Sequence, residues 1–209
     1  MKHALSGIWL FCTLLVTSGT QAAEMGLQPG TSGVALGSSV QFAVTITGLG
    51  DGSAPSLASY DVQLAFDPAV LSFASLAFGD PLLGDQLDLL GLGSTTLVDT
   101  ATAGVIGAFE LSFDDENTLN TLQSSAFTLL HVTFDAIAAA LNTPIEIVIL
   151  DLASASGGSI TATTSGASVT ITAAPAPATS LLLAAGCVLL WPFRRGLRAS
   201  GALANPGVA

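Results

Sequence analysis

Hydrophobic and polar side chains alternate with a period of two residues along most of residues 34–172. In one segment, Val40, Phe42 and Val44 occupy every second position, with polar or small residues between them. Because successive side chains of a β-strand point to opposite faces of a sheet, this period predicts half-buried strands. The positions expected to face a core in the other alternating segments are Tyr60, Val62, Leu64, Phe66, Leu71, Phe73, Phe109, Leu111, Phe113, Leu130, Val132, Phe134, Ile145, Ile147, Ile149, Val169 and Ile171.

Turn-forming residues separate these segments. Residues 48–55 are rich in Gly, Asp and Ser, and Asp67-Pro68 follows the segment that ends at Phe66. Helical periodicity is weak, and only residues 116–123 allow a helical turn. About eight or nine short strands separated by turns are typical of an all-β sandwich. We therefore expect a domain of this class at residues 24–173.

The loop at residues 79–93 is unusually apolar for its length. A long loop of this kind is expected either to pack on the sandwich or to bind another molecule. Its hydrophobic residues are Leu82, Leu83, Leu87, Leu89 and Leu90.

Residues 1–23 have the pattern of a secretory signal peptide. Lys2 and His3 precede an apolar run at residues 8–16, which is too short to span a bilayer. Small residues around Gln21 predict cleavage after Ala22 or Ala23. We therefore expect the chain to be exported.

A second apolar segment lies near the C-terminus. A Pro/Ala linker precedes it, and the composition predicts a transmembrane helix at about residues 177–193. Arg194, Arg195 and Arg198 follow, and they would stay on the cytoplasmic side and leave the domain outside. Residues 199–209 are expected to form a disordered tail. The alternative, a buried helix of a soluble protein, fits the linker and the arginines less well.

Charge is divided between the ends and the middle of the chain. The only basic residues are Lys2 and the three C-terminal arginines, whereas all 15 carboxylates lie between them. A domain without cations cannot neutralise phosphates, so we exclude nucleic-acid binding. Both cysteines, Cys12 and Cys187, also lie in the end segments, so the domain has neither a disulfide framework nor a thiolate metal site.

Catalytic side chains are scarce in the domain. His131 is the single histidine that remains after removal of the signal peptide, and the alternation around it predicts an outward position. The domain has no Lys or Cys to replace it as a base or nucleophile, and it has no Gly-x-Ser-x-Gly or phosphate-binding motif. We therefore expect a protein that is not an enzyme and has no catalytic residues.

Two groups of loop carboxylates are candidates for other chemistry. Paired carboxylates can hydrolyse glycosides, and hard oxygen donors can ligate Ca²⁺. Neither spacing matches a hydrolase motif or an EF-hand, and solvated loop carboxylates are the simplest interpretation. Ca²⁺ is therefore the one candidate cofactor. Its candidate ligands are Asp80, Asp85 and Asp88 in one group, and Asp114, Asp115 and Glu116 in the other.

The C-terminal segment carries a recognisable order of features: the Pro175-Ala176-Pro177 string, the apolar run, and the arginines. This order resembles the PEP-CTERM sorting signal, with Ala176 where that family has Glu. The resemblance covers residues 174–198. It implies processing by an exosortase, a membrane transpeptidase-like enzyme, and a link to exopolysaccharide and biofilm in Gram-negative bacteria.

Residues 60–71 read YDVQLAFDPAVL, an alternating strand that ends in an aromatic residue and is followed by Asp-Pro and a leucine. This string resembles the signature of cohesins, and residues 34–46 and 129–135 are similar to strands of the same family. The resemblance covers about residues 30–173. It implies a jelly-roll-like β-sandwich that binds Ca²⁺-dependent dockerin modules. The candidate contact positions are the outward polar rows Gln41/Thr45 and Asp61/Gln63.

Two other functions stay open. Polysaccharide binding on this fold usually uses exposed aromatic rings, but Tyr60 is the only Tyr of the domain, the domain has no Trp, and its phenylalanines are mostly expected inside. A purely structural matrix protein is the second alternative. For all three functions we expect an envelope or extracellular location, with the C-terminal helix holding the chain at the membrane at least transiently.

Overall fold

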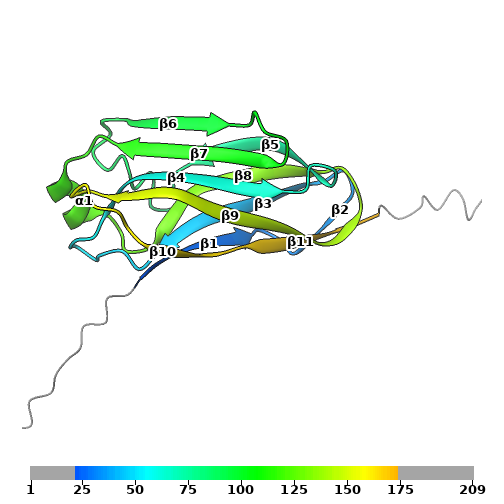
Figure 1. The fold of residues 1–209 in the computed structure, drawn as a ribbon, viewed down its shortest axis with the longest axis horizontal. Helices are drawn as coiled ribbons and strands as arrows, with labels where there is room; N and C mark the ends of the chain where they lie inside the picture. Colours follow the sequence, from blue (N-terminus) through cyan, green and yellow to red (C-terminus); the bar gives the residue numbers. More distant parts are fainter. Residues whose placement is uncertain (1–21, 174–209) are drawn as a thin grey trace, which may run out of the picture.

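Two β-sheets packed face to face make up the computed structural model, which describes residues 22–173 (Figure 1). A seven-residue helix, α1 (Glu116–Leu122), lies at one end, as the sequence allowed. Sheet A contains, in spatial order, β10 (Ala162–Ser165), β1 (Ala23–Pro29), β3 (Ser39–Thr47), β8 (Phe127–Ala136) and β5 (Leu71–Phe78). Sheet B contains β2 (Gly33–Ala35), β11 (Ala167–Thr172), β9 (Ala140–Ser154), β4 (Leu57–Phe66), β7 (Val105–Ser112) and β6 (Ser94–Asp99).

The eleven strands exceed the eight or nine that the alternation predicts. Three of the strands, β2, β6 and β10, lie at the edges of the sheets. Their side chains are exposed or half-buried on both faces, so their sequences carry no alternation to detect. The short length of β2 and β10 weakens the signal further.

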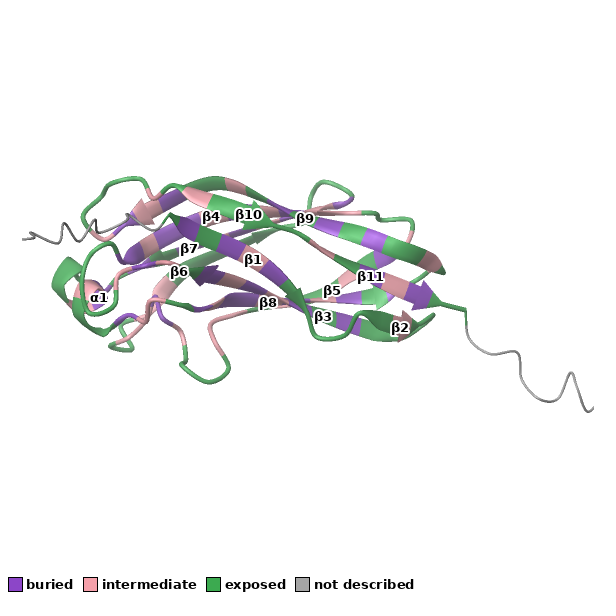
Figure 2. Cartoon of the chain, turned by 90° about the horizontal axis from the view of Figure 1, so that it is seen from below, coloured by how far each residue is buried: buried purple, intermediate pink, exposed green. Residues whose placement is uncertain are grey.

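Alternating burial runs along the inner strands, as Figure 2 shows. On β3 and β8 the expected core positions are buried and the residues between them face outward. On β9 a bulge opposite Asp61 and Val62 changes the phase: Asp151 pairs with Asp61 and Ile149 with Val62, which leaves Leu150 without a partner on β4. Leu150 and Asp151 are therefore both exposed.

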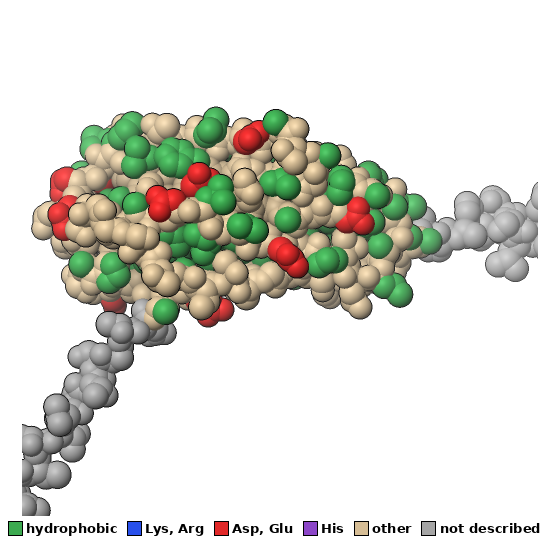
Figure 3. All heavy atoms as spheres, viewed as in Figure 1, with side chains coloured by type: hydrophobic (Ala, Val, Ile, Leu, Met, Phe, Trp, Pro, Cys, Tyr) green, Lys and Arg blue, Asp and Glu red, His purple; other side chains and the backbone are tan. Residues whose placement is uncertain are grey.

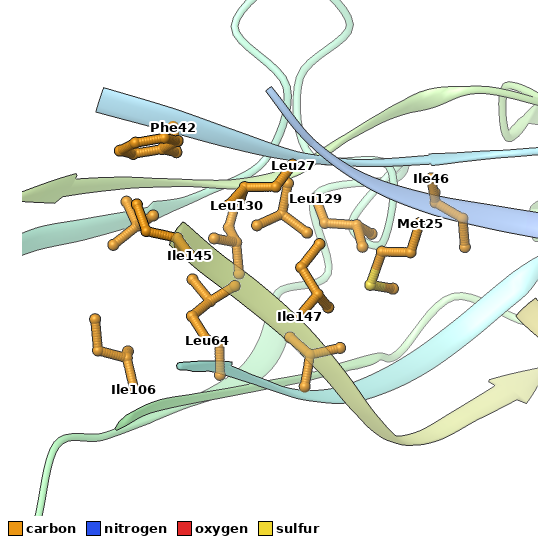
Figure 4. Close-up of a cluster of buried hydrophobic side chains, with 14 of the residues drawn as sticks. Met25, Leu27, Phe42, Ile46, Leu64, Ile106, Leu129, Leu130, Ile145 and Ile147 are labelled. Carbon is orange, nitrogen blue, oxygen red and sulfur yellow. The ribbon is translucent and has the colours of Figure 1, made fainter. Parts of the chain in front are cut away.

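The core lies between the two sheets, where aliphatic side chains from both interdigitate (Figure 4). Three aromatic rings add to it. The Phe134 ring packs edge-on against Phe42, with 6.0 Å between the ring centroids, and tilted against Phe66, with 4.9 Å. Phe42 and Phe134 have no solvent exposure. The buried positions predicted on β3, β4, β8, β9 and β11 are confirmed, except that Phe66 and Ile149 are half-buried against the core.

The phase predicted for β7 is wrong. Phe109 and Leu111 point to the outer face of sheet B, whereas Glu110 is buried on the core side with 1% exposure. The register explains the reversal: Ile106 and Ala108 face the core, and the next residues on that side of the strand are Glu110 and Ser112. Glu110 is tolerated inside because hydroxyl groups of two other strands bind its carboxyl group.

The described chain enters and leaves at opposite ends of the sandwich: β1 begins near α1, and β11 ends at the other end (Figure 1). Both expected signal-peptide cleavage positions adjoin the start of β1 at Ala23. Within residues 22–173 no helix is long and apolar enough to cross a membrane. The expected transmembrane helix at 177–193, Pro175, Ala176, Pro177 and the arginines lie outside the described residues.

Candidate functional site

Hydrophobic side chains are exposed on the outer face of sheet B, which faces the viewer in Figures 1 and 3. Leu97 on β6 is 62% exposed and Leu150 on β9 is 54% exposed, and Phe109 on β7 lies between the two strands in the sheet. Leu111 and Val148 extend the same face. We call these five residues, together with Asp61, Gln63, Asp99 and Asp151, the sheet B face. Exposed apolar residues gathered on one face are typical of interaction sites.

An open hollow of about 410 Å³ lies in the sheet B face. Leu97, Phe109 and Leu150 form its apolar wall, and Asp61, Gln63 and Asp99 supply its polar groups. Gly107 forms part of the lining because it has no side chain to fill the space, and a Cβ there would come within 3.3 Å of the Asp99 Cβ. The hollow therefore suits a side chain that is apolar along its length and cationic at its tip.

The carboxylates of the sheet B face have no cationic neighbours among the residues that the structure describes. Asp61 and Asp151 are directly opposite each other on β4 and β9, and such like-charge pairs destabilise a sheet. Residues 22–173 contain no Lys or Arg, and Figure 3 shows red carboxylates but no blue cations on this face. A partner that brings positive charge would relieve this repulsion.

The four candidate contact positions do not form one surface. Gln41 and Thr45 lie on β3 in sheet A, whereas Asp61 and Gln63 lie on β4 in sheet B, so the two pairs face opposite sides of the sandwich. Around Thr45 the outer face of sheet A is built from small residues: a Cβ on Gly26 would lie 3.3 Å from the Thr45 Oγ1. Only Asp61 and Gln63 belong to the hollow.

The first group of calcium candidates organises loops instead of gathering into a metal site. Asp80 Oδ1 accepts hydrogen bonds from the backbone N–H groups of Leu82 and Leu83, and its Oδ2 accepts one from Thr128. Although burial opposes ionisation, these donors lower the pKa of Asp80 to about 2. Asp85 and Asp88 likewise accept from backbone N–H groups, those of Leu87 and Gly93.

The second group is similar. Asp114 Oδ2 accepts from the Leu89 N–H at 2.6 Å, which ties the loop to the end of β7. Asp115 is the N-cap of α1, and the bonds that it accepts from the Thr118 N–H and hydroxyl lower its pKa. Glu116 lies in the first helical turn. Among residues 22–173, no three His, Cys, Asp or Glu side chains are grouped so that they could hold a metal ion.

His131 lies on the outer face of sheet A, as predicted, with Ala43 and Ala77 beside it on the neighbouring strands. Neither of its ring nitrogens has a hydrogen-bond partner among the described residues, and neither nitrogen is in contact with solvent. A general base needs both a substrate proton within reach and, usually, a group that orients the ring. The described residues supply His131 with no orienting group.

The phenol ring of Tyr60 is 1% exposed, so it cannot stack on a sugar. Its hydroxyl donates to Glu110 Oε2 at 2.9 Å, and the hydroxyl of Ser94 donates to Glu110 Oε1 at 2.7 Å. Asp85 lies next to the same carboxyl group. We call these four residues the acid cluster. The sequence analysis missed it because Glu110 was assigned to the outer face and its partners come from three distant segments.

Burial first, and then the neighbouring Asp85, raise the pKa of Glu110 to about 7, although the hydroxyl groups of Ser94 and Tyr60 stabilise its charged form. Burial and the proximity of Glu110 also raise the pKa of Tyr60, so this phenol stays protonated. The acid cluster is enclosed by β4, β6, β7 and the loop of residues 79–93, and it opens onto no described hollow of the sheet B face. We therefore take the sheet B face as the candidate functional site.

Comparisons with known proteins give matches among solved structures alone: no protein-family model and no curated protein matches the chain. A cohesin module from a family 33 glycoside hydrolase of Clostridium perfringens shares 11% identity and a TM-score of 0.56, with 74% of this chain and 100% of that chain covered.

Two further cohesins extend the likeness. One, from Clostridium thermocellum, was solved in a type I cohesin–dockerin complex and has 11% identity and a TM-score of 0.55 over 72% of this chain and 99% of that chain. A non-cellulosomal cohesin from the archaeon Archaeoglobus fulgidus has 15% identity and a TM-score of 0.50 over 72% and 91%. The two-sheet sandwich of residues 22–173 is therefore the cohesin fold.

Proposed function

We propose that the chain is an exported, non-catalytic docking module that binds a dockerin-type protein partner through the sheet B face. The observation that carries this proposal is the combination of exposed Leu97 and Leu150 with uncompensated carboxylates around one hollow. Apolar side chains that are exposed around a polar hollow gain free energy when a partner covers them. Structures with the same fold have been solved in complex with dockerins, which supports this class of partner.

The partner's contact surface is expected to be basic and partly apolar. Asp61, Asp99 and Asp151 place negative charge on the sheet B face, and residues 22–173 supply no Lys or Arg to compensate it. Complementary charge accelerates association, and its effect is screened by salt. Affinity should therefore fall as ionic strength rises.

The observations favour a protein partner over a polysaccharide. Tyr60 is buried, and residues 22–173 contain no Trp, so the face has no ring of the kind that usually stacks on sugars. Phe109 is the one aromatic side chain that lines the hollow. A glycan array probed with the chain is the direct check, because strong and selective glycan binding would favour the carbohydrate alternative.

We also propose that residues 1–23 direct export and that residues 174–198 are a PEP-CTERM-type signal for an exosortase, which would place the domain at the cell envelope. The support is the order of motif, apolar run and arginines in the sequence. Fractionation of cells that express the chain, with and without Arg194, Arg195 and Arg198, tests the anchor.

Replacing Phe109 by alanine should weaken binding to a dockerin module at least tenfold, because this ring stands beside the hollow, where contact residues contribute most. The measurement is surface plasmon resonance of the chain against dockerin-type modules, with and without Ca²⁺. Thr45→Ala, on the outer face of sheet A, is the matched control and should change the affinity by less than about twofold. If Thr45→Ala weakens binding and Phe109→Ala does not, the sheet assignment is wrong. If no dockerin module binds under either condition, the partner class is wrong.

A further inference from the structure

Three hydrophobic side chains are exposed at the end of the sandwich where β11 ends. Leu36 follows β2, Ile137 follows β8 and Leu141 is the second residue of β9, and they are 38%, 51% and 80% exposed. Green hydrophobic side chains are visible at this end of the domain in Figure 3. We give the name apolar tip to the segments that meet here, residues 33–38, 137–144 and 168–173.

Hydrogen bonds join the segments of the apolar tip. The Leu36 N–H donates at 2.8 Å to the carbonyl oxygen of Thr172, the last residue of β11. The Gly37 N–H donates at 2.8 Å to Ala136, directly before Ile137. On its other side, β11 pairs with the start of β9. Because neighbouring strands lie about 5 Å apart, the three exposed side chains share one end surface.

A β-bulge positions Leu141. At this point two residues of β9, Leu141 and Asn142, lie opposite Thr170 of β11. Asn142 has a φ of 52°, in the left-handed region that asparagine tolerates. Its N–H donates to Thr170 Oγ1, and that hydroxyl donates to Asn142 Oδ1, each at 3.3 Å. The most exposed leucine of the apolar tip therefore belongs to a hydrogen-bonded part of the sheet.

The apolar tip carries no charge. None of its residues is Asp, Glu, Lys or Arg, although all 15 carboxylates of the chain lie within residues 22–173. The opposite end of the domain differs, because its exposed Leu82 and Leu122 share a loop and a helix with Asp80 and Glu116. An end that is both apolar and uncharged can enter a lipid surface without burying a charge.

Carboxylates border the apolar tip. Asp135 and Glu146 are each two residues away from it along the chain, and Asp67 lies in the turn before Val70, whose carbonyl oxygen accepts from the Ile137 N–H. An anionic membrane surface would repel these groups. The charge pattern therefore favours a surface of zwitterionic lipid headgroups.

The chain leaves the described domain at the apolar tip. β11 ends at Thr172, and the apolar run proposed to span a membrane begins at about residue 177. A chain extends by at most about 3.6 Å per residue, so these five residues span no more than about 18 Å. Attachment of residues 177–193 to a bilayer would therefore keep the apolar tip within this distance of the membrane surface, whatever path the intervening residues take.

We propose that the apolar tip is a lipid contact of the folded domain, which inserts Leu36, Ile137 and Leu141 into the headgroup layer of a zwitterionic bilayer. The inference rests on the proposed membrane attachment of residues 177–193 and adds a second contact to it. Insertion at one end of the long axis would hold the domain upright on the bilayer, with α1 at the far end (Figure 1).

Lipid photolabelling of the full chain tests this contact. The chain is reconstituted in vesicles of phosphatidylcholine and phosphatidylethanolamine that include a phosphatidylcholine with a diazirine near the start of an acyl chain. After illumination and digestion with pepsin, mass spectrometry identifies the labelled peptides. Labelling of the Leu36, Ile137 and Leu141 peptides should exceed that of the Leu97 and Leu150 peptides by about fivefold or more, because the latter two are similarly exposed but lie on the sheet B face.

Leu141→Asp should reduce labelling of the Leu36 and Ile137 peptides by about tenfold, because insertion would then require dehydration of a carboxylate. Leu82→Asp is the matched control, since Leu82 is still more exposed than Leu141 but lies in the loop of residues 79–93, which contacts the C-cap of α1. It should leave the labelling unchanged. If Leu141→Asp does not fold, Ile137→Gln serves in its place. Wild-type labelling in the folded tip variant would overturn the proposal.

The lipid contact and the anchor can fail separately. Labelling of residues 177–193 without labelling of the apolar tip would overturn the contact and leave the anchor intact. Labelling of the tip alone would confirm the contact and contradict the anchor, and labelling of neither would overturn both. Tip labelling that disappears as the ratio of chain to lipid rises would assign this surface to a second copy of the chain and overturn the lipid contact.

Discussion

Replacing Phe134 by alanine is expected to lower the free energy of unfolding by about 3–5 kcal/mol, because a fully buried ring leaves a cavity that a packed sandwich cannot collapse to fill. Phe134 connects the two sheets: it touches Phe42 within sheet A and Phe66 of sheet B. Its removal therefore weakens both aromatic contacts at once. Urea unfolding followed by circular dichroism gives the change in free energy.

Phe113→Ala is the matched control for this substitution. The Phe113 side chain is 55% exposed beyond the end of β7, so its loss should change the free energy of unfolding by less than about 1 kcal/mol. Equal losses for Phe113 and Phe134 would contradict the placement of the core between the sheets. A loss in Phe134→Ala that comes with a smaller denaturant slope would indicate a change in the unfolded or native ensemble instead.

Replacing Gln123 by alanine should lower the free energy of unfolding by about 2–4 kcal/mol, because it leaves buried backbone groups without partners. The Gln123 Oε1 accepts from the Leu57 N–H at 2.7 Å, and its Nε2 donates to the carbonyl oxygens of Leu57 and Gln86, each at 2.9 Å. The side chain is 3% exposed, so water cannot replace these bonds. It thereby connects the end of α1, the start of β4 and the loop of residues 79–93, the end-loop.

Gln28→Ala controls for the loss of a glutamine as such, since Gln28 is exposed on β1 and should change stability by less than about 0.5 kcal/mol. Thermal unfolding of both variants, read by calorimetry, makes the comparison. If Gln123→Ala unfolds at the wild-type temperature, the three hydrogen bonds do not hold these segments together.

Much of the fold can be predicted from the alternation of apolar and polar residues, as individual strands show. On β3 and β8 the inner face is large and apolar and the outer face small and polar, so the phase follows from the residues themselves. On β7 the two faces are reversed from this pattern: the apolar Phe109 faces outward into the hollow, and Glu110 faces inward toward hydroxyl groups. A local pattern cannot reveal this, because the groups that make Glu110 tolerable are supplied by β4, β6 and the end-loop.

The candidate site was predictable in part. Asp61 and Gln63 were identified as outward polar positions of β4, and the structure places both in the hollow. Leu97 was not identified, because β6 is an edge strand whose sequence does not indicate which of its faces is buried. Leu150 was not identified, although alternation with Ile147 and Ile149 places it on the outer face; the bulge on β9, which the sequence does not reveal, turns Asp151 outward beside it. Gln41 and Thr45 were candidates alongside Asp61 and Gln63 because sequence alone does not tell which strands share a sheet.

The exposed end-loop and the lack of Lys and Arg in residues 22–173 together determine which proteases can cleave this domain. Proteases of trypsin specificity cut after Lys or Arg, and every such residue of the chain, Lys2, Arg194, Arg195 and Arg198, lies outside residues 22–173. Exposed loop tips are normally the first places to be nicked. Trypsin therefore has no cleavage site in the end-loop, in α1 or in any strand of residues 22–173, whether these are folded or unfolded.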